Sequence, residues 1–231
     1  MQLENLHQLY INEQSLHERY NFIAGIDEAG RGPIAGPVVI AAVILDFKHP
    51  ISGINDSKKL SSRKREELFP QITQQAIDFA VVEISSAQID KVNILQAVLE
   101  GMREAINALS VKPELCLIDG NILPSGLSFP AQACVKGDAI YASIAAASIL
   151  AKVTRDKIML EQDAVFPQYG FARHKGYPTS QHLQALKIYG PCPLHRFSYQ
   201  PVKDSIRLFS GKKDTDKKKS NISGILSPET N

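Results

Sequence analysis

The chain has 231 residues, of which 44% are hydrophobic and 22% are charged, and 26 basic against 24 acidic residues give a net charge of +2. These values are close to globular averages and exclude a fibrous chain or one that is disordered throughout. The near-neutral balance gives no global sign of nucleic-acid binding, so any such surface must be local.

The length suits one domain of generous size with a substantial core. The longest apolar run, residues 38–45, is much shorter than the roughly 20 residues that a membrane-spanning helix needs. The first residues carry no secretory signal, so we expect a cytoplasmic protein without a membrane anchor. Three widely spaced cysteines favour neither disulfides nor a zinc site, and Cys116 and Cys134 are expected to be buried thiols.

The first 20 residues are expected to form a helical extension packed on the body of the chain. A buried strand is predicted over residues 22–27, where an apolar run is interrupted only by glycine. A second buried strand is predicted over residues 38–45 because of its β-branched content, and the two strands could pair directly.

Two adjacent carboxylates lie at the end of the first of these strands, with Asp27 as its last residue and Glu28 directly after it. Charge at the end of a buried strand is unfavourable unless a cation compensates it, and a metal ion is the simplest such cation. Gly30 and Gly32 would let the backbone approach a ligand closely, and Arg31 between them offers a planar fork of donors for phosphate. The alternative is an ordinary charged turn on the surface.

A basic turn precedes the next predicted helix. Either Ser61 or Ser62 could be the N-cap of this helix, although the glutamate of a capping box is missing. The exposed N–H groups of a helix start, beside Lys58 and Lys59, would make a phosphate site. A solvated basic turn is the alternative. Pro70 is expected to interrupt or end the helix.

The middle of the chain predicts a third strand over residues 78–84 and a helix over 93–109 with one apolar stripe. A further strand over 115–119 ends in an aspartate followed by glycine. In a parallel sheet, Asp119 would reach the edge near Asp27 where ligands bind in open α/β folds. Taken alone, Asp119 before a glycine is a common turn residue.

A small-residue run over 139–153 has high helix propensity and few charges, so it predicts a buried helix lying close against the sheet. Asp138 precedes this helix and can be its N-cap, a further acidic ligand, or both. Arg155 and Asp156 are expected at the polar end of the helix, in structural roles.

The segment 171–179 is expected to be a loop in which basic and aromatic residues occur together, a mixture that often meets single-stranded or distorted nucleic acid. Helices are predicted over 179–189 and 202–209. From residue 210 the lysine-rich tail is expected to be disordered. We expect this tail to keep the protein in solution. The alternative is that its lysines attract nucleic acid in a salt-dependent way.

Six motifs, in order along residues 22–197, together resemble bacterial ribonuclease HII. They are DEAGRGP (27–33), DSKKLS (56–61), IDG (118–120), KGD (136–138), the helix over 143–156 and HKGY (174–177). The related ribonuclease HIII typically lacks the arginine between the two glycines and carries a large N-terminal domain. Arg31 and the short N-terminal segment therefore favour HII.

The resemblance implies an α/β fold of the ribonuclease H-like kind, with a mixed central sheet flanked by helices and a C-terminal helical part. The corresponding division of the chain is an N-terminal helical extension (1–20), a catalytic domain (21–209) and a disordered tail (210–231).

The resemblance also implies an endonuclease that cleaves RNA in RNA–DNA hybrids and cuts 5′ of single ribonucleotides in duplex DNA. Its products would carry 5′-phosphate and 3′-hydroxyl ends, as ribonucleotide excision and primer removal in DNA replication and repair require. The expected partners of the protein are therefore RNA–DNA hybrids and duplex DNA that contains ribonucleotides. The protein is expected to be a monomer. A non-catalytic nucleic-acid-binding module and a type I ribonuclease H are the alternatives.

By the same resemblance, the catalytic residues and metal ligands are Asp27, Glu28, Asp119 and Asp138, holding two Mg²⁺ or Mn²⁺ ions. Oxygen-only ligands suit these ions and argue against zinc. Because neighbours on a regular strand face opposite sides, Asp27 and Glu28 could share a metal pair only if the strand ends or twists there, which Gly30 would permit.

The expected substrate-binding residues are Gly30, Arg31, Gly32, Ser57, Lys58, Lys59, Lys175 and Tyr177. The glycine loop would bring backbone groups to the 2′-hydroxyl, which alone distinguishes RNA from DNA at one position. Tyr177 would read the junction by lying against the neighbouring deoxyribose.

Overall fold

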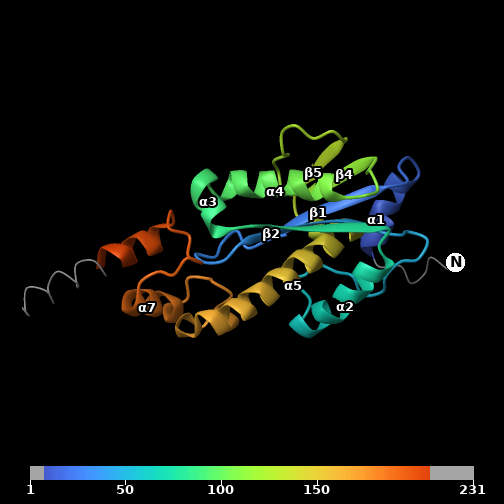
Figure 1. The fold of residues 1–231 in the computed structure, drawn as a ribbon. Coiled ribbons are helices and arrows are strands. Elements are labelled where there is room, and N and C mark those ends of the chain that lie inside the picture. The colour runs from blue at the N-terminus through green and yellow to red at the C-terminus, as the bar shows by residue number, and fades with distance from the viewer. Residues whose placement is uncertain (1–7, 209–231) are drawn as a thin grey trace, which may run out of the picture. The chain divides into compact units, whose positions relative to one another are not determined.

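A computed structural model describes residues 8–208 of the chain (Figure 1). These residues form two compact units. The first, here called the sheet unit, comprises the residues up to Arg31 together with Pro37–Ile158. The second, here called the helical unit, comprises Gly32–Gly36 and the residues from Met159 onward.

The sheet unit is built on one five-stranded mixed sheet of order β3-β2-β1-β4-β5. The central strand β1 pairs antiparallel with β2 and parallel with β4, while β2–β3 is antiparallel and β4–β5 is parallel. The strands are β1 (Ile23–Ala29), β2 (Val38–Ile44), β3 (Asp78–Ile84), β4 (Leu115–Asp119) and β5 (Ala131–Cys134). The predicted mixed α/β sheet and the direct pairing of the first two strands are confirmed.

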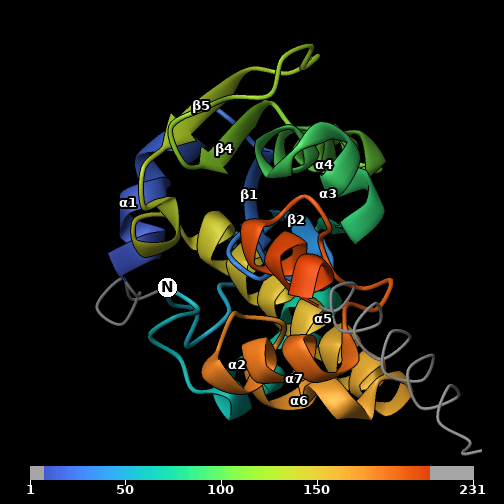
Figure 2. The ribbon, with the colours of Figure 1, turned by 90° about the vertical axis from the view of Figure 1, so that its left-hand side faces the viewer.

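Helices cover both faces of this sheet. Helix α4 packs on β2, β3 and β1 with its apolar stripe, and the small residues of α5 pack with alternate residues of β2 on the opposite face (Figures 1 and 2). Helices α1 and α2 add apolar side chains to the α5 side. The helical elements are α1 (Gln8–His17), α2 (Ser62–Gln75), α3 (Ser86–Val92), α4 (Ile94–Ala108), the short 3-10 helix η2 (Gly137–Ala139) and α5 (Ala142–Val165).

Helix α5 differs from the predicted helix at both ends. It begins at Ala142 and continues to Val165, so Arg155 and Asp156 lie inside it and not at its end. Arg155 is fully buried and donates from Nε to the carbonyl oxygen of Pro37 at 2.9 Å. Asp156 accepts a hydrogen bond from Lys152 one turn earlier.

The N-terminus of α5 is capped by a side chain from a different helix. The buried carboxylate of Glu13 in α1 accepts a hydrogen bond from the backbone N–H of Ser143 at 2.9 Å. A negative charge at a helix N-terminus is favoured by the exposed N–H groups and by the helix dipole. The N-cap alternative for Asp138 is therefore wrong, because Asp138 lies in η2, before α5 begins.

Helix α2 begins as predicted and continues beyond the predicted stop. Ser61 is its N-cap, with the hydroxyl oxygen accepting from the Lys64 N–H, but the helix continues through Pro70 to Gln75. Proline inside a helix removes one hydrogen bond and disfavours the preceding turn. Leu68 and Ile72 on either side of it are fully buried in the core. Their burial outweighs the effect of the proline, so the expectation that Pro70 ends the helix is wrong.

The helical unit has its own core, centred on Tyr169, Phe171 and Leu186. The segment Gly32–Gly36 belongs to this unit, because buried Arg196 donates to the carbonyl oxygens of Pro33 and Gly36. The predicted loop over 171–179 contains one helical turn. The helices are η3 (Pro167–Tyr169), α6 (Phe171–His174), α7 (Ser180–Tyr189) and a last helix over 200–208.

All three cysteines are free and buried, as expected for Cys116 and Cys134. Burial raises the pKa of Cys116 to about 12, so this thiol stays protonated and inert. Within residues 8–208, no helix is long and apolar enough to cross a membrane. Residues 1–7 and the predicted disordered tail from 210 lie outside the described residues.

Candidate active site

The site forms at the ends of β1 and β4, two neighbouring strands whose connections lead to opposite edges of the sheet. From β1 the chain continues to β2 and β3 on one side, and from β4 it continues to β5 on the other. The parallel pairing of β1 with β4 ends at Ile26 and Ile118, immediately before Asp27 and Asp119. The carboxyl ends of parallel strands at such a switch point are the usual ligand site of an open α/β sheet. The predicted convergence of the two aspartates at one edge is confirmed.

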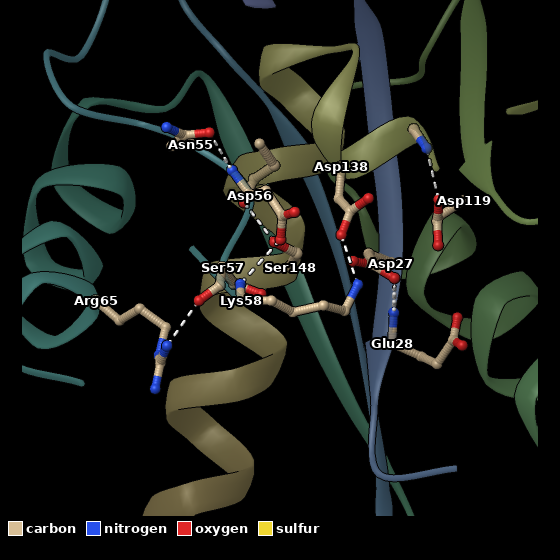
Figure 3. Close-up of polar contacts among 12 residues, drawn as sticks. Asp27, Glu28, Asn55, Asp56, Ser57, Lys58, Arg65, Asp119, Asp138 and Ser148 are labelled. Carbon is tan, nitrogen blue, oxygen red and sulfur yellow. Dashed lines mark hydrogen bonds and ion pairs between the residues drawn. The ribbon is translucent and has the colours of Figure 1, made fainter. Parts of the chain in front are cut away.

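Two further elements reach this edge of the sheet (Figure 3). The Oδ1 atom of Asp119 accepts a hydrogen bond from the Gly137 N–H at 2.7 Å, which ties the η2 turn to the end of β4. The next residue, Asp138, is 3% exposed and forms an ion pair with Lys58, with 2.7 Å between Oδ2 and Nζ. Side chains from four distant parts of the sequence therefore meet here.

Burial and neighbouring negative charges make three of the carboxyl groups hard to ionise, those of Asp27, Glu28 and Asp119. Burial raises the pKa of Asp27 well above its usual value, and the negative charges of Glu28, Asp119 and Asp138 raise it further. Burial also raises the pKa of Glu28, opposed by Arg31, and the pKa of Asp119, opposed by the hydrogen bond from Gly137. A bound cation would remove this penalty, because it favours the charged form of each carboxyl.

The side chain of Glu28 points to the opposite side of the strand from that of Asp27. Strand β1 stays paired with β2 through Ala29, so it does not end at residue 27 as predicted, and successive side chains alternate in direction. In Figure 3 the Glu28 side chain extends away from Lys58 and Asp138. Its Oε1 is 3.4 Å from the guanidinium of Arg31. Glu28 and Arg31 therefore form a pair at the margin of the cluster.

The donors fit a hard divalent cation by their chemistry. The four side chains offer only carboxylate oxygens, the ligands that Mg²⁺ and Mn²⁺ prefer. Across residues 8–208, no three His, Cys, Asp or Glu side chains are close enough as they stand to enclose a metal ion. In the described structure, Lys58 and Arg31 supply positive charge to the carboxylates. The cluster thus attracts cations, and its oxygens would have to draw together around a metal.

The basic turn before α2 is held by its own hydrogen bonds. Asp56 accepts from the Lys58 N–H at 2.9 Å through its side chain, and Arg65 donates to the carbonyl oxygens of Ser57 and Leu60. The hydrogen bond to Asp138 raises the pKa of the Lys58 ammonium group. Sequence reasoning did not single out Asp56 or Arg65. The Asn-Asp-Ser-Lys sequence, typical of an Asx turn, is the signal that indicates Asp56.

The predicted substrate residues of this turn differ in exposure. Lys59 is exposed, whereas Ser57 is buried and offers its carbonyl to Arg65. The Lys58 side chain is 77% exposed even though its ammonium group is paired. Lys58 therefore lies between the acidic cluster and solvent, where a phosphate could reach it.

Gly30 has a structural reason to be glycine. Its φ is +108°, and a Cβ added there would lie 2.2 Å from Nε of the buried Arg155 side chain. A larger residue would displace Arg155, which holds the Pro37 carbonyl at the start of β2. The Arg155 side chain of α5 therefore packs directly against the loop that carries Arg31.

Three predicted substrate residues belong to the helical unit. A Cβ added to Gly32 would lie 3.4 Å from Cε1 of Tyr177, so the tyrosine ring lies against this glycine. Tyr177 is 45% exposed, which leaves part of its ring open to a ligand. The ammonium group of Lys175 donates to the Ala172 carbonyl at 2.6 Å. The structure therefore brings Gly32 and Tyr177 together.

Known proteins resemble this chain in sequence and in fold. Residues 24–202 match the family model described as ribonuclease HII. The chain is 56% identical over 185 residues to a ribonuclease HII of Albidiferax ferrireducens, covering 80% of this chain and 89% of that protein. It is 51% identical over 186 residues to one of Acinetobacter baylyi, covering 80% and 98%. The solved ribonuclease H2 of Pyrococcus horikoshii aligns with a TM-score of 0.72 and 30% identity over 82% of this chain and 99% of that chain.

Proposed function

The chain belongs to the ribonuclease HII family, and we propose that it is a metal-dependent endonuclease that also cuts 5′ of single ribonucleotides in duplex DNA. Family membership makes it a type 2 ribonuclease H, an endonuclease that acts on RNA in RNA–DNA hybrids. The observation that supports the metal-dependent step is the convergence of buried carboxyls with raised pKa values where β1 and β4 separate. We expect this enzyme to act as a monomer in the cytoplasm.

Asp27, Asp119 and Asp138 would hold the divalent ions, with Glu28 as the fourth ligand. Mg²⁺ or Mn²⁺ bound there would supply Lewis-acid stabilisation to the attacking and leaving oxygens of the phosphodiester. The products would carry a 5′-phosphate and a 3′-hydroxyl, the ends that DNA repair synthesis can use directly.

The cationic side chains would hold the phosphate backbone. Lys58 can turn from Asp138 to a phosphate oxygen because most of its side chain faces solvent. The Arg31 side chain is 51% exposed and offers a planar donor fork suited to two phosphate oxygens. Lys59 and Lys175 would add sequence-independent attraction.

Selection of the ribonucleotide would depend on the glycine loop and Tyr177. Backbone groups of Gly30 and Gly32 would approach the 2′-hydroxyl, the group that distinguishes RNA from DNA at one position. The exposed part of the Tyr177 ring would lie against the next sugar, where a second 2′-hydroxyl would crowd it. The preference would therefore be for an RNA-to-DNA junction.

The activity is tested with a labelled duplex that carries one ribonucleotide. We expect a single cut 5′ of the ribonucleotide when Mg²⁺ or Mn²⁺ is present and none after chelation, with a 3′-hydroxyl that a DNA polymerase can extend. A duplex that is bound but stays uncut with every divalent ion would instead support a non-catalytic nucleic-acid-binding module.

Replacing Tyr177 by alanine should change specificity more than stability. We expect Tyr177→Ala to lose about tenfold more kcat/KM on a duplex with one ribonucleotide than on a long RNA–DNA hybrid, because the ring would contact only the junction sugar. Tyr189→Ala, which truncates a similarly exposed tyrosine on α7, is the matched control and should leave the ratio of the two activities unchanged. Equal losses on both substrates in Tyr177→Ala would contradict the junction-reading role.

A further inference from the structure

The helical unit contains a cluster of three buried histidines that the acidic site does not use. His182 and His195 are fully buried and His174 is 8% exposed. The rings of His174 and His182 are stacked, with 4.4 Å between centroids and 14° between planes. His182 and His195 lie side by side with 3.0 Å between their Nε2 atoms. Three buried imidazoles in contact need a defined pattern of protons.

The partners of each ring fix that pattern. Nδ1 of His182 lies 2.9 Å from the carbonyl oxygen of Tyr177, which can only accept, so this nitrogen carries a proton. Nδ1 of His195 lies 3.0 Å from the Cys192 nitrogen and 3.2 Å from the Cys192 carbonyl oxygen, so these contacts alone allow either tautomer. Because the neutral His182 ring has its proton on Nδ1, its Nε2 can only accept, which places the proton of His195 on Nε2. The Nε2–H of His195 must then donate to Nε2 of His182. The result is a directed relay from Cys192 through both imidazoles to the Tyr177 carbonyl.

The relay requires both rings to be neutral. Burial lowers the pKa of His182 and of His195 to about 4, so near neutral pH each ring carries one proton and no charge. A second proton on either ring would place two N–H groups against each other and break the chain. Near neutral pH the hydrogen bonds of the relay therefore all keep the same donor and acceptor.

The relay ends on the backbone of the residue proposed to read the junction. The Tyr177 N–H donates to the His174 carbonyl at 2.9 Å, so both backbone polar groups of this residue are held. The preceding residue, Gly176, has a φ of +82°, and a Cβ there would lie 2.3 Å from the Ala35 carbonyl oxygen. The backbone at 176–177 is thus fixed, while the tyrosine ring remains 45% exposed.

We propose that His182 and His195 are positioning residues that hold the Tyr177 ring in register with the sugar beside a single ribonucleotide. The inference rests on the proposed junction-reading role of Tyr177 and extends it to residues that never touch the substrate. The Tyr177 carbonyl oxygen also accepts from the Thr179 N–H at 2.8 Å, so breaking the relay leaves the ring present and removes one of the two hydrogen bonds on this carbonyl. Discrimination between substrates then falls, while cleavage of long hybrids falls less.

The variants separate the hydrogen bond from the burial. His182→Leu fills the space with an apolar side chain and removes the Nδ1–H donor to the Tyr177 carbonyl. It should lower the ratio of kcat/KM on a single-ribonucleotide duplex to kcat/KM on a long hybrid by about five- to tenfold. His182→Asn keeps an N–H close to the position of Nδ1 and loses the acceptor for His195, so it should restore only part of the ratio. Leu186→Ala, a buried change on the same helix, should lower the Tm without changing the ratio.

The outcomes distinguish this inference from the proposed function. If Tyr177→Ala shifts the ratio and His182→Leu does not, the positioning role is overturned. If Tyr177→Ala itself leaves the ratio unchanged, it is the proposed reading of the junction that fails. Should His182→Leu not fold, nitrogen NMR of the wild-type protein decides: protons on Nδ1 of His182 and Nε2 of His195 support the relay, and any other tautomer overturns it.

Discussion

Asp27→Asn is expected to abolish cleavage, by at least about a thousandfold in kcat/KM, without unfolding the protein. Asp27 is 4% exposed, and the charges of Glu28, Asp119 and Asp138 act against its ionisation. Asparagine has nearly the same shape, and its Oδ1 can still accept the 2.7 Å hydrogen bond from the Glu28 N–H. The change therefore removes the charge that a cation needs and leaves the strand intact.

Stability measured beside activity makes this result specific. Removing a buried charge from a repulsive cluster should leave the Tm of the metal-free protein unchanged or raise it. Asp46→Asn is the matched control, because Asp46 is only partly buried, in a turn where it contacts His49. The activity of this variant should equal that of the wild type. Normal cleavage by Asp27→Asn would remove Asp27 from the catalytic residues.

Gly25→Ala is expected to lower the free energy of unfolding by about 3 kcal/mol or more. Gly25 lies in the central strand, where a Cβ would be 2.1 Å from the Ser143 carbonyl carbon and 2.2 Å from the Ile144 nitrogen. These are backbone atoms at the start of α5, and no rotamer change can move them. Ser143 is also held by Glu13, so the helix cannot shift away without losing its cap.

Urea unfolding followed by circular dichroism measures this loss. Gly126→Ala is the control, because Gly126 has a φ of +72° and no atom within 4 Å of an added Cβ. Its cost is backbone strain alone, about 1 kcal/mol. If the two variants were equally stable, the close approach of β1 and α5 would be disproved. Because Asp138 lies just before α5, any folded fraction of Gly25→Ala should also cleave poorly.

The strands of the sheet could be predicted because their sequences carry local signals. Residues 78–84 form β3 as predicted, and the apolar run before Asp119 forms β4. Strand β5 was missed because Ala131–Cys134 has low β propensity and pairs only with β4. Helix α3 was missed because it is short. It ends at Val92, and the next residue, Asn93, is already the N-cap of α4.

Errors in the helices arose where distant contacts override local preference. Residues 154–165 are too charged to indicate a buried helix, yet Arg155 is buried because it reaches the Pro37 carbonyl. Pro70 is accommodated because the residues around it fill the core. The cap of α5 comes from Glu13, 130 residues away, which no local pattern around Asp138 could show.

For the site, the residue types were predictable and their partners were not. Carboxylates at strand ends indicated Asp27 and Asp119, and the sheet topology brings them together. The pairing of Lys58 with Asp138 joins residues 80 positions apart. The histidine relay is equally hidden, because His182 and His195 stand in different segments and only their buried contact gives them a common role.

Crystals of the wild-type protein grown with Mn²⁺ and a duplex carrying one ribonucleotide test the central claim most directly, through anomalous scattering from manganese. The account predicts manganese peaks bonded to carboxylate oxygens of Asp27, Asp119 and Asp138 beside the phosphate 5′ of the ribonucleotide. Manganese bound elsewhere, with Asp138 still paired to Lys58 and no peak at the end of β1, would contradict it.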